Sequence, residues 1–185
     1  MNFEEAVMPH LDAAYNLARW LTRNEHDAQD MVQEAYLRAL RFFGGFHGTD
    51  ARAWLLTIVR NTCYTWLKRR QATEFSCDFE EVVMTKESDE LDPESSHELK
   101  VQAQLINEAI EKLPVEFREV VILRELEELS YKEIAAITGI PIGTVMSRLS
   151  RARKRLLAYL RNAAQVDLGG TNVVHVRASG NNRVA

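Results

Sequence analysis

The chain has 185 residues, of which 46% are apolar and 27% charged, and its net charge is −4. These values are ordinary for a soluble globular protein, exclude wholesale disorder, and allow one domain or two small ones. The longest uncharged stretch, 134–147, is too short to cross a membrane. Acids stand near the N-terminus where a secretory signal would carry Lys or Arg, so we predict a cytoplasmic protein.

Charge is unevenly distributed along the chain. Residues 73–98 carry ten acidic groups and one basic group, whereas residues 1–72 have a net charge of +1 and residues 99–163 a net charge of +3. The acidic stretch has no clean apolar period and cannot bury enough apolar surface to offset the entropy of ordering. We therefore predict a flexible acidic linker over 73–98 between two small domains, 1–72 and 99–163, and a disordered tail over 164–185.

Apolar spacing predicts three helices in residues 1–72. Apolar residues recur at intervals of three and four from Leu11 to Leu21, and a second stripe runs from Ala28 to Phe43. Asn24 is placed to cap this second helix. Glycines at 44, 45 and 48 then interrupt the pattern. A third helix, over 51–70, would bury Leu55, Ile58, Val59, Thr62 and Trp66 on one face.

Residues 99–163 are also predicted to be helical, so the expected fold class is all-α. One helix ends at Pro114 and the next covers 120–126. Ser130 and Glu133 have the spacing of a capping box that opens a short helix. Gly139 ends that helix, and a final helix is expected over 144–160.

The segment 134–160 has the plan of a helix-turn-helix DNA-binding unit, with a short helix, a turn closed by Gly139 and a second helix with its own apolar anchors. Six basic residues and no acidic one lie between Thr144 and Arg161. This density of positive charge suits phosphate contacts, and side chains near the helix start can reach base edges. An ordinary helical hairpin with a solvated basic face is the alternative.

The second predicted helix has a polar face opposite its apolar stripe. Asp30, Gln33, Glu34 and Arg41 lie on this face around Leu37. A leucine ringed by polar groups resembles a small docking patch, and a solvated face is the alternative.

The outer face of the third predicted helix interleaves aromatic, amide and basic groups. Arg60, Asn61, Tyr64 and Lys68 lie there, and Trp54 stands near the helix start. Aromatic rings stack on bases and cations hold the phosphate backbone, so this face suits single-stranded nucleic acid. Burial of Trp54 and Tyr64 in the core is the alternative.

The sequence shows no pattern typical of catalysis or of a resident ligand. The five histidines are scattered, no glycine-rich phosphate loop is present, and Cys63 and Cys77 lack metal-site spacing. We expect Cys63 to act as a small hydrophobe and Cys77 to be exposed. We therefore predict no metal, no cofactor and no enzymatic activity.

Three separated motifs resemble those of the extracytoplasmic-function sigma factors of bacterial RNA polymerase. Residues 27–36 (DAQDMVQEAY) are similar to the D-A-x-D-x-x-Q-E-x-[FY] signature of sigma region 2, and F-H-G at 46–48, R-A-W-L at 52–55 and R-N at 60–61 match the segment that follows. L-P at 113–114, L-S-Y-K-E-I-A at 129–135 and G-T-V-M-S-R-L at 143–149 match region 4. The motifs span nearly all of residues 10–160.

This resemblance implies a role for each surface. The polar face of the second helix would bind the clamp helices of the largest polymerase subunit, the third helix would bind the −10 promoter element, and the final helix would read the −35 element. Phe46 and Asn61 would border a pocket for a flipped base. The residues implied are Asp27, Asp30, Gln33, Glu34 and Leu37 for core polymerase; Phe46, Trp54, Arg60, Asn61, Tyr64 and Lys68 for the −10 element; and Thr144, Met146, Ser147, Arg148, Arg151 and Arg155 for the −35 element.

The predicted function is therefore that of a sigma factor, which binds core polymerase, recognises promoters and nucleates strand opening for a regulon that responds to stress or a signal. The family resemblance also implies an anti-sigma protein as partner, and a linker that enters a polymerase channel. A stand-alone helix-turn-helix regulator that dimerises on a palindromic operator is the alternative. No spare heptad supports that alternative.

Overall fold

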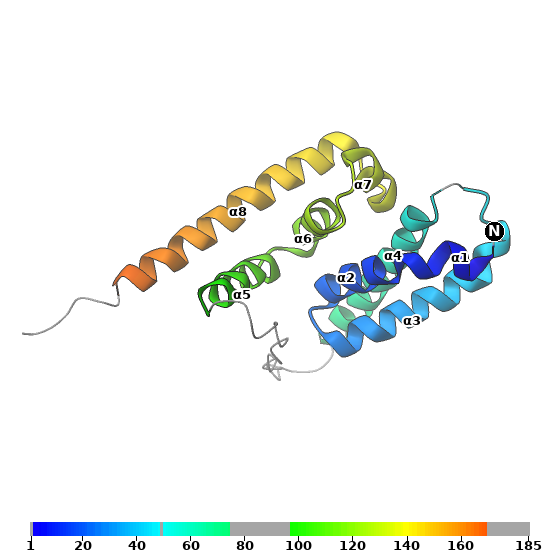
Figure 1. Ribbon diagram of the computed structural model, residues 1–185, viewed down its shortest axis with the longest axis horizontal. Coiled ribbons are helices and arrows are strands. Elements are labelled where there is room, and N and C mark those ends of the chain that lie inside the picture. The colour runs from blue at the N-terminus through cyan, green and yellow to red at the C-terminus, as the bar shows by residue number, and fades with distance from the viewer. Residues whose placement is uncertain (1, 49, 75–96, 170–185) are drawn as a thin grey trace, which may run out of the picture.

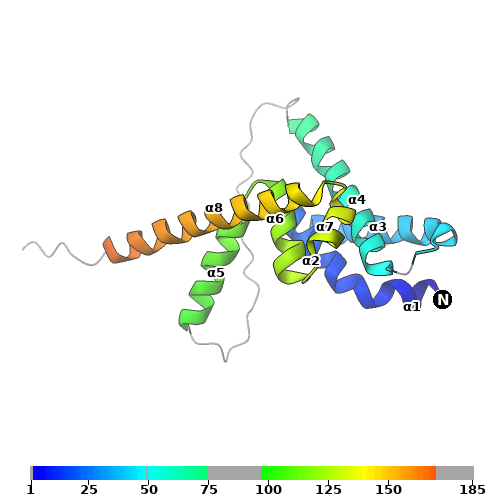
Figure 2. The same ribbon diagram turned by 90° about the horizontal axis from the view of Figure 1, so that it is seen from above.

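The computed structural model describes residues 2–48, 50–74 and 97–169, and every regular element within them is helical. Two groups of helices lie side by side (Figures 1 and 2). We call residues 2–74 the first half and residues 97–169 the second half. Most of the predicted linker, with Cys77, lies outside the described residues, as does the tail beyond Gly169.

The first half contains the three helices predicted from apolar spacing and one that was not predicted. Its elements are α1 (Phe3–Val7), a 3-10 turn (Met8–His10), α2 (Leu11–Thr22), α3 (Glu25–Phe42), a 3-10 turn (Phe43–Gly45) and α4 (Ala51–Glu74). Helix α1 is too short to show a helical period in the sequence. The Asn24 cap is confirmed, because its side chain accepts a hydrogen bond of 3.0 Å from the backbone N–H of Asp27.

The second half follows the predicted order of helices with different ends. Its elements are α5 (His97–Glu111), α6 (Val115–Val121), a π-helical turn (Ile122–Leu126), α7 (Tyr131–Thr138) and α8 (Ile142–Gly169). Ser130 and Glu133 form the predicted capping box, and Gly139 ends α7 with a φ of 70°. Helix α8 continues past Leu160 and past Ala164, where a tail was expected, because no helix-breaking residue intervenes before Gly169.

The helix predicted over 120–126 changes from α-helical to π-helical geometry at Ile122. The backbone N–H of Glu127 bonds to the carbonyl of Ile122 at 3.1 Å, one residue farther back than in an α-helix. The chain then leaves through Glu128 at a φ of 55°, a left-handed conformation that is uncommon for residues other than glycine. This altered turn sets the position of Glu127 at the boundary between the two halves.

One buried apolar cluster runs through both halves. Helix α2 contacts α6, and α4 contacts α7, so the halves share a core (Figure 1). Leu40 was predicted to lie in the buried stripe of α3, but it is 53% exposed because it falls at the edge of the face that α2 and α4 cover. Fully buried members of the cluster include Leu17, Leu55 and Val59 of the first half and Ile122, Leu123 and Ile134 of the second.

Candidate polymerase and nucleic-acid interfaces

The polar face of α3 borders a groove between α3 and α4. Leu37, at the centre of the predicted docking patch, is 57% exposed at this groove. Asp27 is predicted for the same surface, and its carboxylate lies 3.6 Å from the guanidinium of Arg70 on α4. The groove is lined by Asp30, Met31, Gln33, Glu34, Leu37, Arg38, Thr62, Thr65, Trp66 and Arg69.

The outer face of α4 exposes part of the predicted −10 surface. Asn61 and Lys68 are exposed and lie seven residues apart, about two helical turns, so they share one line along the helix. Trp54 lies on the same line a further two turns back, with its ring 4.7 Å from that of Phe46. Both rings are half-buried in an aromatic cluster with Phe43. Core packing therefore leaves part of each ring exposed.

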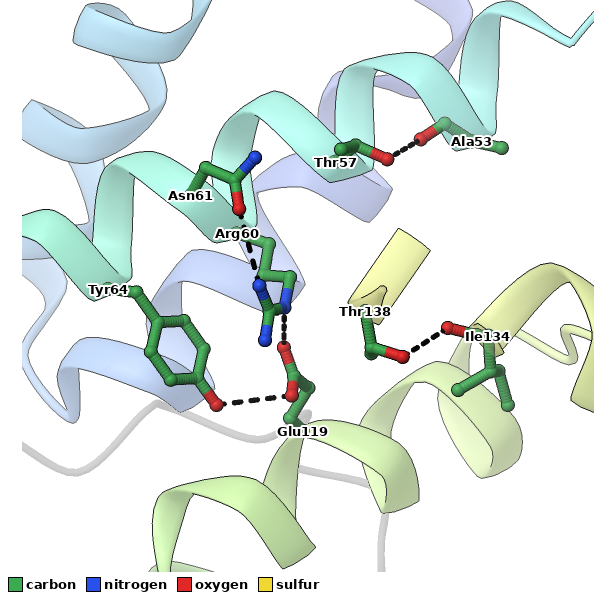
Figure 3. A network of polar contacts seen from close by, with 8 residues as sticks. All are labelled: Ala53, Thr57, Arg60, Asn61, Tyr64, Glu119, Ile134 and Thr138. Atoms are coloured by element: carbon green, nitrogen blue, oxygen red, sulfur yellow. Dashed lines mark hydrogen bonds and ion pairs between the residues drawn. The ribbon is translucent and has the colours of Figure 1, made fainter. Parts of the chain in front are cut away.

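The other predicted −10 residues of α4 face the second half. The Arg60 guanidinium donates a hydrogen bond to one carboxylate oxygen of Glu119 at 2.5 Å, and the Tyr64 hydroxyl donates one to the other oxygen at 3.1 Å (Figure 3). Glu119 belongs to α6 and is completely buried. The Arg60 guanidinium also lies 4.4 Å from the centre of the Tyr64 ring.

Burial dominates the electrostatics of this contact. It raises the pKa of the Glu119 carboxyl, while the nearby charge and hydrogen bond of Arg60 act in the opposite direction. Burial, followed by the negative charge of Glu119, also raises the pKa of the Tyr64 hydroxyl. Tyr64 therefore stays a hydrogen-bond donor over the whole physiological pH range.

A second polar contact joins the halves at Glu127, which is 5% exposed. Arg52 of α4 donates to its carboxylate at 2.6 Å and to its backbone carbonyl at 2.9 Å, and Asn16 of α2 donates to the other carboxylate oxygen at 3.2 Å. Sequence reasoning did not identify Glu119 or Glu127 as site residues. For Glu119 the available signal was an acid within the strongly apolar run 117–123.

The predicted −35 residues at the start of α8 differ in how exposed their side chains are. Met146, Ser147 and Arg151 are exposed, whereas Thr144 and Arg148 are half-buried. The guanidinium of Arg155 lies 4.9 Å from the centre of the Phe117 ring. Opposite these side chains, the helix is anchored in the core by Val145, Leu149 and Ala152.

Within the described residues, no group of three or more His, Cys, Asp and Glu side chains is arranged to hold a metal ion. In the same part of the chain, no helix combines the length and the hydropathy needed to cross a membrane.

Two family models match these two halves, Sigma-70 region 2 over residues 6–73 and Sigma-70 region 4 over residues 103–156. The chain is 33% identical to the ECF RNA polymerase sigma factor EcfG of Rhodopseudomonas palustris over 177 residues, which cover 95% of this chain and 93% of that protein. The chain belongs to the extracytoplasmic-function sigma factors. The fold class and the sigma-factor function predicted from the motifs are thereby confirmed.

Further relatives differ in how much of their length this sigma factor spans. It is 34% identical to the ECF RNA polymerase sigma factor SigE of Mycolicibacterium smegmatis over 159 residues, 86% of this chain but only 62% of that protein. Among solved structures, it is similar to the sigma factor RpoE from Bartonella quintana in complex with the anti-sigma factor NepR, with 31% identity and a TM-score of 0.73. That match covers 86% of this chain and 96% of RpoE.

Proposed function

We propose that this sigma factor binds core RNA polymerase through α3, the −10 promoter element through α4 and the −35 element through α8. It acts in the cytoplasm by binding alone, and the polymerase carries out the RNA chemistry. Binding drives strand opening when a base held outside the stack offsets an unpairing cost of about a few kcal/mol. Phe46, Trp54, Asn61 and Lys68 supply the rings, amide and cation for the unpaired strand.

The observation that carries this proposal is the exposed face of α3. Leu37 is 57% exposed with Asp30, Gln33 and Glu34 beside it, whereas the opposite face of the helix is covered by α2 and α4. Figure 1 shows α3 on the side of the first half that faces away from α8. A partner can therefore reach this face without displacing the second half.

An anti-sigma protein is proposed as a second partner. The support is the Bartonella quintana relative, which was solved in complex with the anti-sigma factor NepR. Release from such a partner would couple transcription to a stress or another signal. The exposed face of α8, with Met146, Ser147 and Arg151, supports −35 recognition once the protein is released.

Charge reversal at Asp30 tests core binding. We expect Asp30→Lys to weaken binding to purified core polymerase in size-exclusion chromatography and to reduce run-off transcription from a mapped promoter. Asp30 is exposed, so the substitution should change the free energy of unfolding by no more than about 0.5 kcal/mol.

The matched control is Glu4→Lys, an equal charge reversal at an exposed residue of α1 that does not line the groove. It should bind core polymerase like the wild type. Equal affinity of wild type, Asp30→Lys and Glu4→Lys would show that the α3 face does not dock on core polymerase. If the protein bound a palindromic operator as a dimer, and run-off transcription by core polymerase did not depend on it, the stand-alone regulator would be favoured instead.

A further inference from the structure

An ion pair joins the π-helical turn to α8 beside the surface proposed for the −35 element. The Arg153 guanidinium of α8 donates to one carboxylate oxygen of Glu125 in that turn at 2.7 Å. Both side chains are exposed. Neither residue has a role in the proposed function.

Arg153 continues a line of exposed side chains that begins at Met146. The two residues are seven apart, about two helical turns, so their side chains project from the same side of α8. Ser150 lies between them on this side and is exposed as well. When the start of α8 reads base edges in the major groove, an arginine two turns farther along the same side reaches the sugar-phosphate backbone.

The segment that carries Glu125 is held in place by its neighbours. The Arg124 guanidinium donates to the backbone carbonyl of Leu129 at 2.8 Å and lies 5.2 Å from the centre of the Tyr131 ring. Tyr131 also interacts with Arg153 through its side chain. The Glu125 carboxylate therefore extends from a fixed backbone position, although the side chain itself is exposed.

We propose that Glu125 is a positioning residue for −35 recognition, which holds the Arg153 guanidinium where a phosphate of a correctly placed −35 element lies. An arginine has five N–H donors, so a bond to Glu125 leaves others for a phosphate oxygen. The inference rests on the proposed function, because α8 must bind the −35 element for the position of Arg153 to matter.

A held arginine makes the phosphate contact depend on how α8 is placed on the DNA. A free arginine follows the nearest phosphate in any register, so it strengthens binding to every sequence. An arginine held by Glu125 meets its phosphate only in the register that the base contacts impose. In that register the contact also costs less entropy, because the long side chain is already ordered. Glu125 thereby makes a sequence-independent contact favour the −35 element.

The ion pair itself contributes little to the stability of the fold. Exposed ion pairs add little to the free energy of unfolding, because water hydrates each charge well when the pair is apart. Substitution of Glu125 or Arg153 should therefore leave the helices intact, which circular dichroism verifies. The effect of the pair is expected in DNA binding instead.

The test compares holoenzymes that contain full-length variants of this chain. Each variant is reconstituted with core polymerase, and fluorescence anisotropy measures its affinity for a mapped promoter fragment and for the same fragment with a scrambled −35 region. The ratio of the two affinities reports −35 discrimination, and the sequence-independent effect of a lost charge cancels in this ratio. The variants are Glu125→Ala, Arg153→Ala and their combination. The matched control is Glu128→Ala, at an exposed glutamate three residues away.

We expect Glu125→Ala to lower the affinity ratio about threefold to tenfold, the range that follows from ordering one long side chain. Glu128→Ala should keep the wild-type ratio. Arg153→Ala should also lower the ratio, and its plot of log affinity against log salt concentration should be shallower by about 0.9, the loss of one phosphate contact. The combined variant should lose no more discrimination than Arg153→Ala alone, because Glu125 acts through Arg153.

A ratio that Glu125→Ala leaves unchanged would overturn the proposal, and so would an unchanged salt dependence in Arg153→Ala. A further loss of discrimination in the combined variant would show that Glu125 acts on the fold rather than through Arg153. If the wild-type holoenzyme bound both fragments equally, the proposed −35 role of α8 would fail and the inference with it. A wild-type preference that Glu125→Ala retains counts against the inference alone.

Discussion

Neighbouring side chains of α4 that belong to one sequence motif lie in different surroundings in the folded protein. Arg60 and Asn61 are adjacent in the sequence, but Arg60 points to Glu119 while Asn61 is exposed. Successive residues of a helix are rotated by about 100° from each other, so a single motif can serve two surfaces. Only Asn61 and Lys68 of the predicted cationic and amide groups on α4 are exposed.

The thiol of Cys63 should be unreactive in the folded protein. Cys63 is completely buried, and this burial raises its pKa to about 12. The thiolate is the reactive form, so in a Cys77→Ser background we expect no reaction with a thiol reagent such as dithionitrobenzoate at pH 8 until the protein unfolds. Absorbance of the released product measures this. Rapid reaction of the native protein would contradict burial of Cys63.

At the scale of single elements, α7 shows the clearest link between sequence and local structure. The Ser130 backbone N–H donates to the Glu133 carboxylate at 2.7 Å, and the Glu133 N–H donates to the Ser130 hydroxyl at 3.3 Å. These bonds satisfy two donors that a helix start otherwise leaves unpaired. Helix α7 carries the contact between α4 and α8, so its stability matters to both halves.

Loss of the cap should lower stability with a defined pH dependence. We expect Ser130→Ala to reduce the free energy of unfolding by about 1 kcal/mol in chemical denaturation. The hydrogen bonds with the Ser130 hydroxyl and then its backbone lower the pKa of Glu133 below its ordinary value of 4.5. A carboxyl whose pKa is lower in the folded than in the unfolded state stabilises the fold at pH values above its unfolded-state pKa. This stabilisation is lost as the pH falls through the folded-state pKa.

Glu133→Gln should therefore be less stable than the wild type at pH 7, and this difference should shrink as the pH falls below 4.5. Denaturation curves at several pH values measure the trend. A difference that stays constant down to acid pH would show that the Glu133 charge has no part in the cap.

The whole molecule is unified by the core that both halves share. Apolar side chains from α2 and α4 and from α6 and α7 belong to one buried cluster. Two small domains on a linker would each bury a separate core and could unfold independently. Here separation of the halves would expose part of a common cluster, so the shared core holds the two halves together.

Unfolding should consequently be a single cooperative transition at low ionic strength. All three tryptophans (Trp20, Trp54 and Trp66) lie in the first half, so their fluorescence reports that half alone. A fluorophore at Asn162→Cys in a Cys77→Ser background reports the second half. We expect the two thermal midpoints to coincide. Midpoints that differ would show that the shared core does not couple the halves.

The amino-acid sequence by itself determined the longer helices, the caps at Asn24 and Ser130, and the family motifs. These features depend on apolar period, local hydrogen bonding and residue identity, which are all readable within a few neighbouring positions. The outward face of α3 was predicted for the same reason. The domain limits and the entry of the acidic linker into a polymerase channel stay predictions.

Only the tertiary structure decided how the two halves meet. Glu119 and Arg60 are 59 residues apart and Glu127 and Arg52 are 75 apart, so no local pattern links them. A buried carboxylate needs a partner, but the sequence does not say which of the chain's arginines it meets. The π-helical turn at 122–126 and the left-handed Glu128 likewise depend on packing, because a favourable position for Glu127 outweighs the local preference for a regular helix end.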